Sequence, residues 1–265
     1  MRKKNKDIVQ TQINVNTYND YRYTTDGTDT TISPLKRVKN DRRLSKYKVI
    51  EVIASFKKRR KYTMKDYLVE DGRCYPVPGL GGTNILGKNC TTMVPQGICK
   101  MNNYLLITAY DSEGANNSVI YVLDENNHLK ATLVYNRGCH MGGLAYDGKY
   151  LWIAEGSKSG LGAISKEEIL GAIKVSEEKN AKSVQLKNII WQKVSEITST
   201  SYCTYHDNRL WIGMFNKDED SHTYGYEIDY SKDVPTLIKK SHIQVPKRAQ
   251  GICFYEAKGI IYLAN

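Results

Sequence analysis

The sequence predicts an all-β protein, and within that class a β-propeller of four-stranded antiparallel blades. Three observations predict it: a repeat that returns every 46 to 58 residues, a column of small residues inside that repeat, and strands separated by polar turns. A period of this size is typical of propeller blades and of solenoid units. Four short strands within one period favour the propeller.

The repeat is defined by a small residue at the start of the first strand of each blade. Gly97, Gly143, Ser201 and Gly251 occupy this position. The innermost strands of a propeller converge on its axis, where large side chains do not fit. The next two columns are apolar and then small (Ile98, Leu144, Tyr202, Ile252; Cys99, Ala145, Cys203, Cys253).

The repeats divide the chain into blades over residues 94–136, 140–195 and 198–246, with a fourth from 248. Third strands are expected at 118–124 and 223–229, and fourth strands at 129–135 and 237–245. An insertion in the second blade predicts a short helix over 165–173, with Ser165 and Glu168 as a capping box. The fourth blade holds only two strands. Four repeats therefore predict part of a five-bladed or larger ring whose last blade is incomplete. The missing strands would come from the N-terminal segment; we favour instead a fragment of a longer protein or a blade whose end is left open.

The rest of the chain divides into two segments before the propeller of residues 94–265. Residues 1–43 are polar and basic, which predicts a disordered arm. Residues 44–93 are expected to be an extended packing segment that could contribute part of a first blade. Within it, residues 44–56 fit either a strand or a short helix.

The net charge of +11 is concentrated near the N-terminus. Residues 1–75 hold 19 Lys and Arg against 9 Asp and Glu, a net of +10, and the other residues hold 20 against 19. The run 57–61 is entirely basic. We expect a solvated basic patch over residues 36–61 that could contact an anionic polymer or membrane surface; nucleic acid is the alternative.

The cysteines and the hydropathy indicate in which cellular compartment the protein is expected. Cys99, Cys203 and Cys253 fill one repeat column, which predicts buried structural thiols. Cys74 and Cys90 flank a Pro/Gly-rich loop and could pair in an oxidising compartment. The sequence has no apolar stretch of about 20 residues, so no transmembrane segment is expected. A secreted or cell-envelope location is slightly favoured, with a leader outside this chain.

Propeller geometry predicts a site at the mouth of the central channel. The start of each first strand and the end of each second strand lie on one face of the disc, so their side chains should ring one opening. As ligand-binding residues we predict Gln96, Tyr110, Thr200, Phe215, Asn216, Arg248 and Gln250; Asn265 belongs to the same ring. A small polar ligand or a peptide end would fit such a mixture.

The same ring contains the candidates for catalysis, which are His140, Glu155 and Asp111. As a general base, His140 would need a carboxylate such as Glu155 within hydrogen-bond reach. The other histidines lack metal-ligand spacing, so no metal site and no cofactor are expected. Binding of a divalent cation is left as an alternative.

Three families share these motifs. The segments Pro95-Gln96-Gly97-Ile98 and Ala249-Gln250-Gly251-Ile252, with residues 143–152, resemble repeats of bacterial propellers of the YVTN/quinoprotein-like superfamily, over residues 94–265. The gluconolactonase-like family is also similar, but its metal-binding Asn and Asp positions hold Gln96, Gly142, Thr200 and Gln250 here. Hard cations prefer carboxylates, so this departure argues against a metallolactonase. One blade resembles plant-type glutaminyl cyclases, which implies a five-bladed propeller.

Three functions remain open. The first is a non-catalytic, extracellular or envelope-associated binding module with a basic N-terminal arm. The second is a channel-mouth hydrolase, lyase or cyclase that uses His140 and Glu155. The third is an intracellular scaffold that binds protein or nucleic acid. Propellers host unrelated functions, so the fold does not choose among them.

Overall fold

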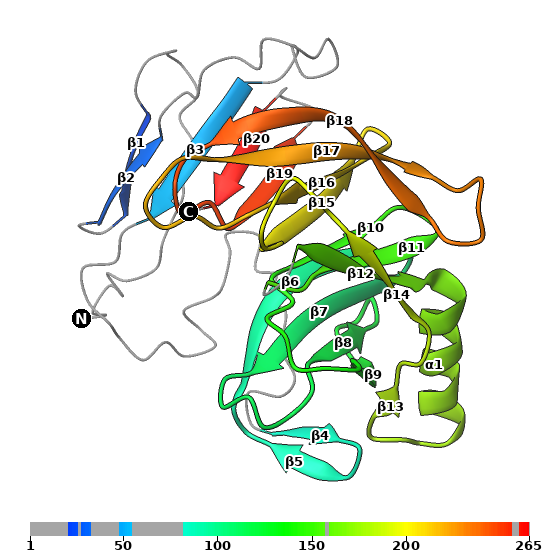
Figure 1. The fold of residues 1–265 in the computed structure, drawn as a ribbon. Coiled ribbons are helices and arrows are strands. Elements are labelled where there is room, and N and C mark those ends of the chain that lie inside the picture. The colour runs from blue at the N-terminus through cyan, green and yellow to red at the C-terminus, as the bar shows by residue number, and fades with distance from the viewer. Residues whose placement is uncertain are drawn as a thin grey trace, which may run out of the picture. The chain divides into compact units, whose positions relative to one another are not determined.

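The computed structural model describes residues 21–25, 28–32, 48–54, 82–156, 159–255 and 260–264. The chain forms two compact units, one of residues 1–76 with 253–265 and the other of residues 77–252. The described residues are mostly strands with one helix, as expected for an all-β protein (Figure 1).

Three antiparallel sheets of four strands make up most of the larger unit. The first sheet contains β6 (Met93–Met101), β7 (Tyr104–Asp111), β8 (Val119–Leu123) and β9 (Leu129–Val134), and β13 (Val184–Gln185) joins it in parallel to β9. The second contains β10 (Gly143–Tyr146), β11 (Tyr150–Ala154), β12 (Gly160–Ser165) and β14 (Ile189–Lys193). The third contains β15 (Tyr202–His206), β16 (Arg209–Gly213), β17 (Ser221–Asp229) and β18 (Thr236–Val245). The prediction of four-stranded antiparallel sheets is confirmed.

The column of small residues lies where the sheets meet. Strand β10 packs against β6 on one side and β15 on the other. A Cβ on Gly97 would lie 3.0 Å from the Leu144 backbone nitrogen, and one on Gly143 would overlap the backbone nitrogen of Cys203. Neighbouring first strands therefore approach closely at these positions, as the small residues predict, and the fold is propeller-like.

Successive residues of a strand enter different cores because side chains alternate across a sheet. Ile153 belongs to the core between the first and second sheets, together with Leu144 and Leu106. Its neighbour Trp152 belongs to the core between the second and third sheets. Trp152 and Ile153 are both fully buried, so β11 is covered on both faces.

The insertion in the second sheet is the helix α1 (Lys166–Glu178), longer than the predicted 165–173. The Ser165 hydroxyl accepts the Glu168 backbone N–H at 3.1 Å. The Glu168 carboxylate instead accepts the Lys187 backbone N–H and the Asn188 side-chain amide, both at 2.8 Å. The capping box is thus formed in one direction only. The helix buries Ile169 against the first core and lies beside β9 and β13 (Figure 1).

A five-stranded sheet combines the two ends of the chain. Its order is β1 (Tyr21–Thr25), β2 (Thr28–Ile32), β3 (Lys48–Ala54), β20 (Ile260–Ala264) and β19 (Gly251–Tyr255). The last repeat contributes two strands, β19 and β20, as expected. Strand β3 of the N-terminal segment pairs with β20 in parallel and extends the sheet, which is the alternative that we did not favour. Of the strand and the short helix that the sequence allows for residues 44–56, the strand is the one observed, over residues 48–54. The hairpin β1–β2 lies within the expected disordered arm, whose other residues lie outside the described ones, as does the basic run 57–61.

A small hairpin, β4 (Thr83–Ile85) with β5 (Lys88–Cys90), precedes the first sheet. Among the described residues, no helix has the length and apolar character needed to cross a bilayer.

The cysteine column is buried only in part. Cys203 is buried and Cys99 is half-buried, but Cys253 is exposed, so the expectation of a buried thiol is wrong there. Ile252 takes the buried side of β19, and the opposite side, where Cys253 lies, is not covered as the equivalent side of β15 is. Cys90 carries a free, buried thiol 3.4 Å from the Thr92 hydroxyl, and Cys74 lies outside the described residues.

Candidate functional site

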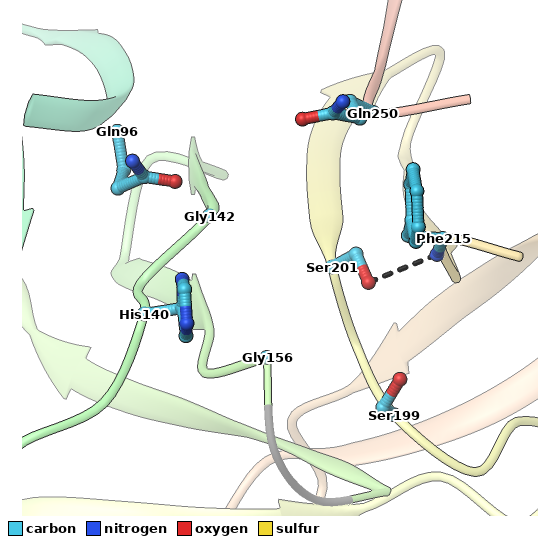
Figure 2. Close-up of a pocket in the computed structure, with 8 residues that line it drawn as sticks. All are labelled: Gln96, His140, Gly142, Gly156, Ser199, Ser201, Phe215 and Gln250. Atoms are coloured by element: carbon cyan, nitrogen blue, oxygen red, sulfur yellow. Dashed lines mark hydrogen bonds between the residues drawn. The ribbon is translucent and has the colours of Figure 1, made fainter. Parts of the chain in front are cut away.

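A pocket of about 330 Å3 opens within the larger unit (Figure 2). Gln96 and His140 lie on one side of it, and Ser201, Phe215 and Gln250 lie on the other. All but one of its lining residues lie just outside an inner strand, and Gln96 lies within β6 at an irregularity of its pairing with β7: Gln96, His140, Gly142, Gly156, Ser199, Ser201, Phe215 and Gln250.

The pocket uses both kinds of strand end that the propeller geometry predicts. Gly142 and Ser201 precede the first strands β10 and β15, and Gln250 precedes β19. Gly156 and Phe215 follow the second strands β11 and β16. Four predicted residues therefore line one pocket: Gln96, His140, Phe215 and Gln250.

His140 is held in place by an aromatic neighbour and a glycine. Its ring lies 4.2 Å from the ring of Tyr110, centroid to centroid, at an interplanar angle of 35°. Gly156 has a φ of +86°, and a Cβ there would lie 2.8 Å from the His140 Cβ. Glycine is required for both reasons. Tyr110 thus supports His140 and is not itself a lining residue.

Thr200 is not a ligand-binding residue in this geometry. Its side chain is fully buried, and its hydroxyl donates to the Gly160 carbonyl at 2.6 Å. Its neighbours Ser199 and Ser201 line the pocket instead. Alternate residues of an extended chain point to opposite sides, so the prediction was displaced by one residue.

The far side of the pocket is tied together by Ser201, whose hydroxyl accepts the backbone N–H of Phe215 at 2.9 Å (Figure 2). The Phe215 side chain is 40% exposed and offers an aromatic face. Asn216 is turned to the following loop, where its side-chain oxygen accepts the backbone N–H of Asp218 at 3.1 Å.

Arg248 also contacts that loop. Its backbone N–H donates to the Asn216 carbonyl at 2.6 Å, and its Nε donates to the Lys217 carbonyl at 3.4 Å. Asn216 and Arg248 therefore shape the rim but do not line the pocket, contrary to expectation. Asn265 lies outside the described residues.

Glu155 does not support His140 as expected. Its carboxylate is 1% exposed, accepts the hydroxyl hydrogen of Tyr135 and lies 3.3 Å from the Arg137 guanidinium. The guanidinium in turn lies 5.1 Å from the ring of Trp191. The physical reason is burial, because a carboxylate taken out of water must be paired and hydrogen-bonded. Burial, then the neighbouring carboxylate, raises the pKa of Tyr135.

Asp111 likewise has a structural role. Its carboxylate is buried and accepts the Thr92 hydroxyl at 2.5 Å, the backbone N–H groups of Glu113, Ala115 and Asn116, and the Asn116 side-chain amide. These bonds, with that of Thr92 first, lower its pKa to about 2. The carboxylate therefore anchors the loop after β7.

Burial disfavours the thiol beside His140 as a nucleophile. Cys139 is buried, and burial raises its pKa to about 12. The thiolate, which is the reactive form, is therefore disfavoured near neutral pH. Nor do any three His, Cys, Asp or Glu side chains among the described residues gather as a metal site would require.

Sequence reasoning missed four lining residues, namely Gly142, Gly156, Ser199 and Ser201. Ser201 stands in the small-residue column, and Ser199 lies two residues before it. Because side chains two residues apart in an extended chain point to the same side, this periodicity would have placed both serines at the pocket. The sequence singled out Gly142 only as a position where gluconolactonase-like proteins bind a metal, and a Cβ there would overlap the Ser201 carbonyl oxygen. The role of Gly156 depends on its positive φ, for which the sequence has no signal.

The comparisons with known proteins show no family membership. No protein-family model matches the sequence, and no curated protein sequence matches it. Solved structures similar in fold include a luciferin-regenerating enzyme, at 10% identity and a TM-score of 0.42, over 61% of this chain and 48% of that one. The chain thus spans about half the length of that relative.

Two further structures match at similarly low identity. A glutaminyl cyclase of Myxococcus xanthus matches at 12% identity and a TM-score of 0.41, over 66% of this chain and 72% of that one. The dihydro-heme d1 dehydrogenase NirN matches at 10% identity and a TM-score of 0.30, over 87% of this chain and 38% of that one.

Proposed function

We propose that the larger unit is a non-catalytic binding module that takes a small, uncharged polar ligand or a peptide end in the pocket of Figure 2. The observation that carries the proposal is the chemistry of the lining. The described residues around the pocket supply two carboxamides, two hydroxyls, an imidazole and an aromatic ring, with no carboxylate, ammonium or guanidinium. Such a surface recognises neutral hydrogen-bonding groups and one flat apolar face.

The state of the two carboxylates favours binding over catalysis. A hydrolase, lyase or cyclase using His140 would need a partner that orients the imidazole and stabilises its charge. Glu155 is engaged by Tyr135 and Arg137, and Asp111 by the loop that it anchors. His140 is positioned by the ring of Tyr110 instead. This tilted ring contact leaves His140 among the residues that line the pocket.

The remaining expectations are kept as proposals. The three stacked sheets would belong to a five-bladed or larger ring. Residues 36–61 would contact an anionic polymer at an extracellular or envelope location. Loss of binding to heparin beads when the five basic residues of the run 57–61 are replaced by glutamine, together with a steep dependence on salt, would support that contact, and salt-independent binding would oppose it.

The binding proposal is tested by calorimetry on the full chain. The probes are neutral monosaccharides and dipeptides blocked at one end only, either by acetylation or by amidation. For any probe that binds, Gln96→Ala and Gln250→Ala should each weaken affinity about fivefold, which corresponds to one lost hydrogen bond of about 1 kcal/mol. Gln244→Ala, an exposed glutamine on β18, is the matched control and should leave binding unchanged.

Two outcomes contradict the proposal. Equal losses in Gln96→Ala and Gln244→Ala would place the ligand elsewhere. Turnover of a bound probe that His140→Ala abolishes while affinity is kept would favour the channel-mouth enzyme.

A further inference from the structure

Two histidines that are 20 residues apart in the sequence become neighbours on the third sheet. His222 lies on β17 and His242 on β18, the outermost strand of that sheet. The register pairs His222 with Gln244 and Tyr224 with His242. Side chains of directly paired residues share a face, so His222 and His242 are diagonal neighbours on one face.

The two imidazole rings are close and approach each other at a steep angle. Their centroids lie 5.1 Å apart with an interplanar angle of 68°. Tyr224 lies next to both, with its ring centroid 5.9 Å from that of His222 and 6.1 Å from that of His242. The rings therefore form an edge-to-face pair beside a tyrosine, on strands that fix their positions.

This spacing matches that of two imidazoles on one metal ion. With metal–nitrogen bonds of about 2.1 Å and a tetrahedral angle, two such rings have their centroids about 5 Å apart. Imidazole nitrogen is a preferred ligand of Zn²⁺, Cu²⁺ and Ni²⁺. From this geometry we infer that His222 and His242 form a surface site for a divalent transition-metal ion, with water completing its coordination.

The pair is open to an incoming ion. His242 is exposed and His222 is half-buried, so an ion can reach the pair from solvent.

One charged neighbour opposes the cation and supplies a test. The Lys239 ammonium lies 5.1 Å from the centroid of the Tyr224 ring, on the same face. It also lies 3.8 Å from the Glu196 carboxylate, which partly offsets its charge. Removal of this ammonium should strengthen the binding of a metal ion to the pair. If the two histidines bind no metal, the metal affinity of the protein should not change.

The experiment is a calorimetric titration of the full chain with ZnCl2 at pH 7.5 in a buffer that does not bind metals. His222→Ala and His242→Ala should each weaken Zn²⁺ affinity by about tenfold or more. Mutation of a residue that only hydrogen-bonds to a metal ligand already lowers metal affinity by about tenfold, and loss of a ligand itself should lower it at least as much. Lys239→Met should tighten binding about threefold by removing a repulsive charge. His128→Ala is the control, because that exposed side chain pairs with Asp124 at 3.4 Å, and it should change nothing.

A spectroscopic arm separates the assigned site from other histidines. Electron paramagnetic resonance of one equivalent of Cu²⁺ should show hyperfine coupling to two nitrogens, and to one or none in His242→Gln. Far-ultraviolet circular dichroism checks that each variant is folded. The absence of Zn²⁺ binding to the unmodified chain overturns the inference. So does unchanged affinity in folded His222→Ala and His242→Ala, or an equal loss in His128→Ala.

Discussion

The hydroxyl of Tyr135 donates a hydrogen bond to the carboxylate of Glu155, and this contact joins the first sheet to the second. Tyr135 follows β9 and Glu155 follows β11, and both side chains are at most 1% exposed. A Cβ on Gly162 would overlap the Tyr135 hydroxyl, so β12 leaves room for it. The most buried acid near the pocket thus holds two sheets together.

The first prediction tests that role. Tyr135→Phe should destabilise the protein by about 1–3 kcal/mol, because the Glu155 carboxylate loses a donor while it stays buried. Urea unfolding measures the change. Tyr205→Phe is the matched control, since the Tyr205 hydroxyl makes only an exposed 3.5 Å contact with Asn208, and its stability should stay within about 0.5 kcal/mol of the wild type. Equal effects of the two variants would rule out a structural role for the buried bond.

The second prediction concerns the close approach of the first strands. Gly143→Ala should cost about 3 kcal/mol or more, because the new methyl group overlaps the backbone at Tyr202 and Cys203, which cannot rotate away. Gly171→Ala is the opposite case. Gly171 lies in α1 with open space around its Cβ direction, so alanine should stabilise the protein by up to about 1 kcal/mol. Wild-type stability of Gly143→Ala would contradict the close packing of β10 against β15.

The third prediction concerns acid stability. The folded state lowers the Asp111 pKa to about 2 from the ordinary value of 3.8, so it binds this proton less readily than the unfolded chain. The stabilisation is therefore complete above about pH 4 and is lost as the pH falls toward 2. Asp111→Asn should destabilise the protein by about 1–3 kcal/mol at pH 7, and the gap from the wild type should narrow below pH 4. Thermal unfolding across pH 2–7 measures it.

Asp207, exposed in the turn between β15 and β16, provides the control for that series. Asp207→Asn should leave the pH dependence of unfolding as it is in the wild type. A constant gap between Asp111→Asn and the wild type down to pH 2 would show that ionisation of Asp111 is not linked to folding.

The fourth prediction concerns the thiols. Cys253 is exposed, whereas Cys139 and Cys203 are buried, so only Cys253 among these three should react rapidly with a disulfide reagent at pH 8. Burial also raises the pKa of the half-buried Cys99 to about 11, which slows its reaction. In the Cys74→Ser variant, labelling should show one rapidly reacting thiol. This fast phase should disappear when Cys253→Ser is added. Survival of the fast phase in that double variant would contradict the exposure of Cys253.

Local chemistry in the sequence determined most of the fold. The small residues at 97, 143 and 201 mark strands that pack closely, because no larger side chain fits there. Turn residues and alternating apolar residues likewise located the strands of the three sheets, and Ser165 located the start of α1. The same reasoning placed His140, Phe215 and Gln250 near the ends of inner strands, and these residues line one pocket together with Gln96, which lies within β6.

Only the tertiary structure decided the partners of each polar group. Tyr135 and Arg137 take Glu155 away from His140, and His222 meets His242 across two paired strands. Strand β3 pairs with β20 from more than 200 residues away. Strand periodicity fixes which face a side chain occupies, but contacts between strands depend on register and on which sheets stack. Those are properties of the packed chain, and no local pattern of residues encodes them.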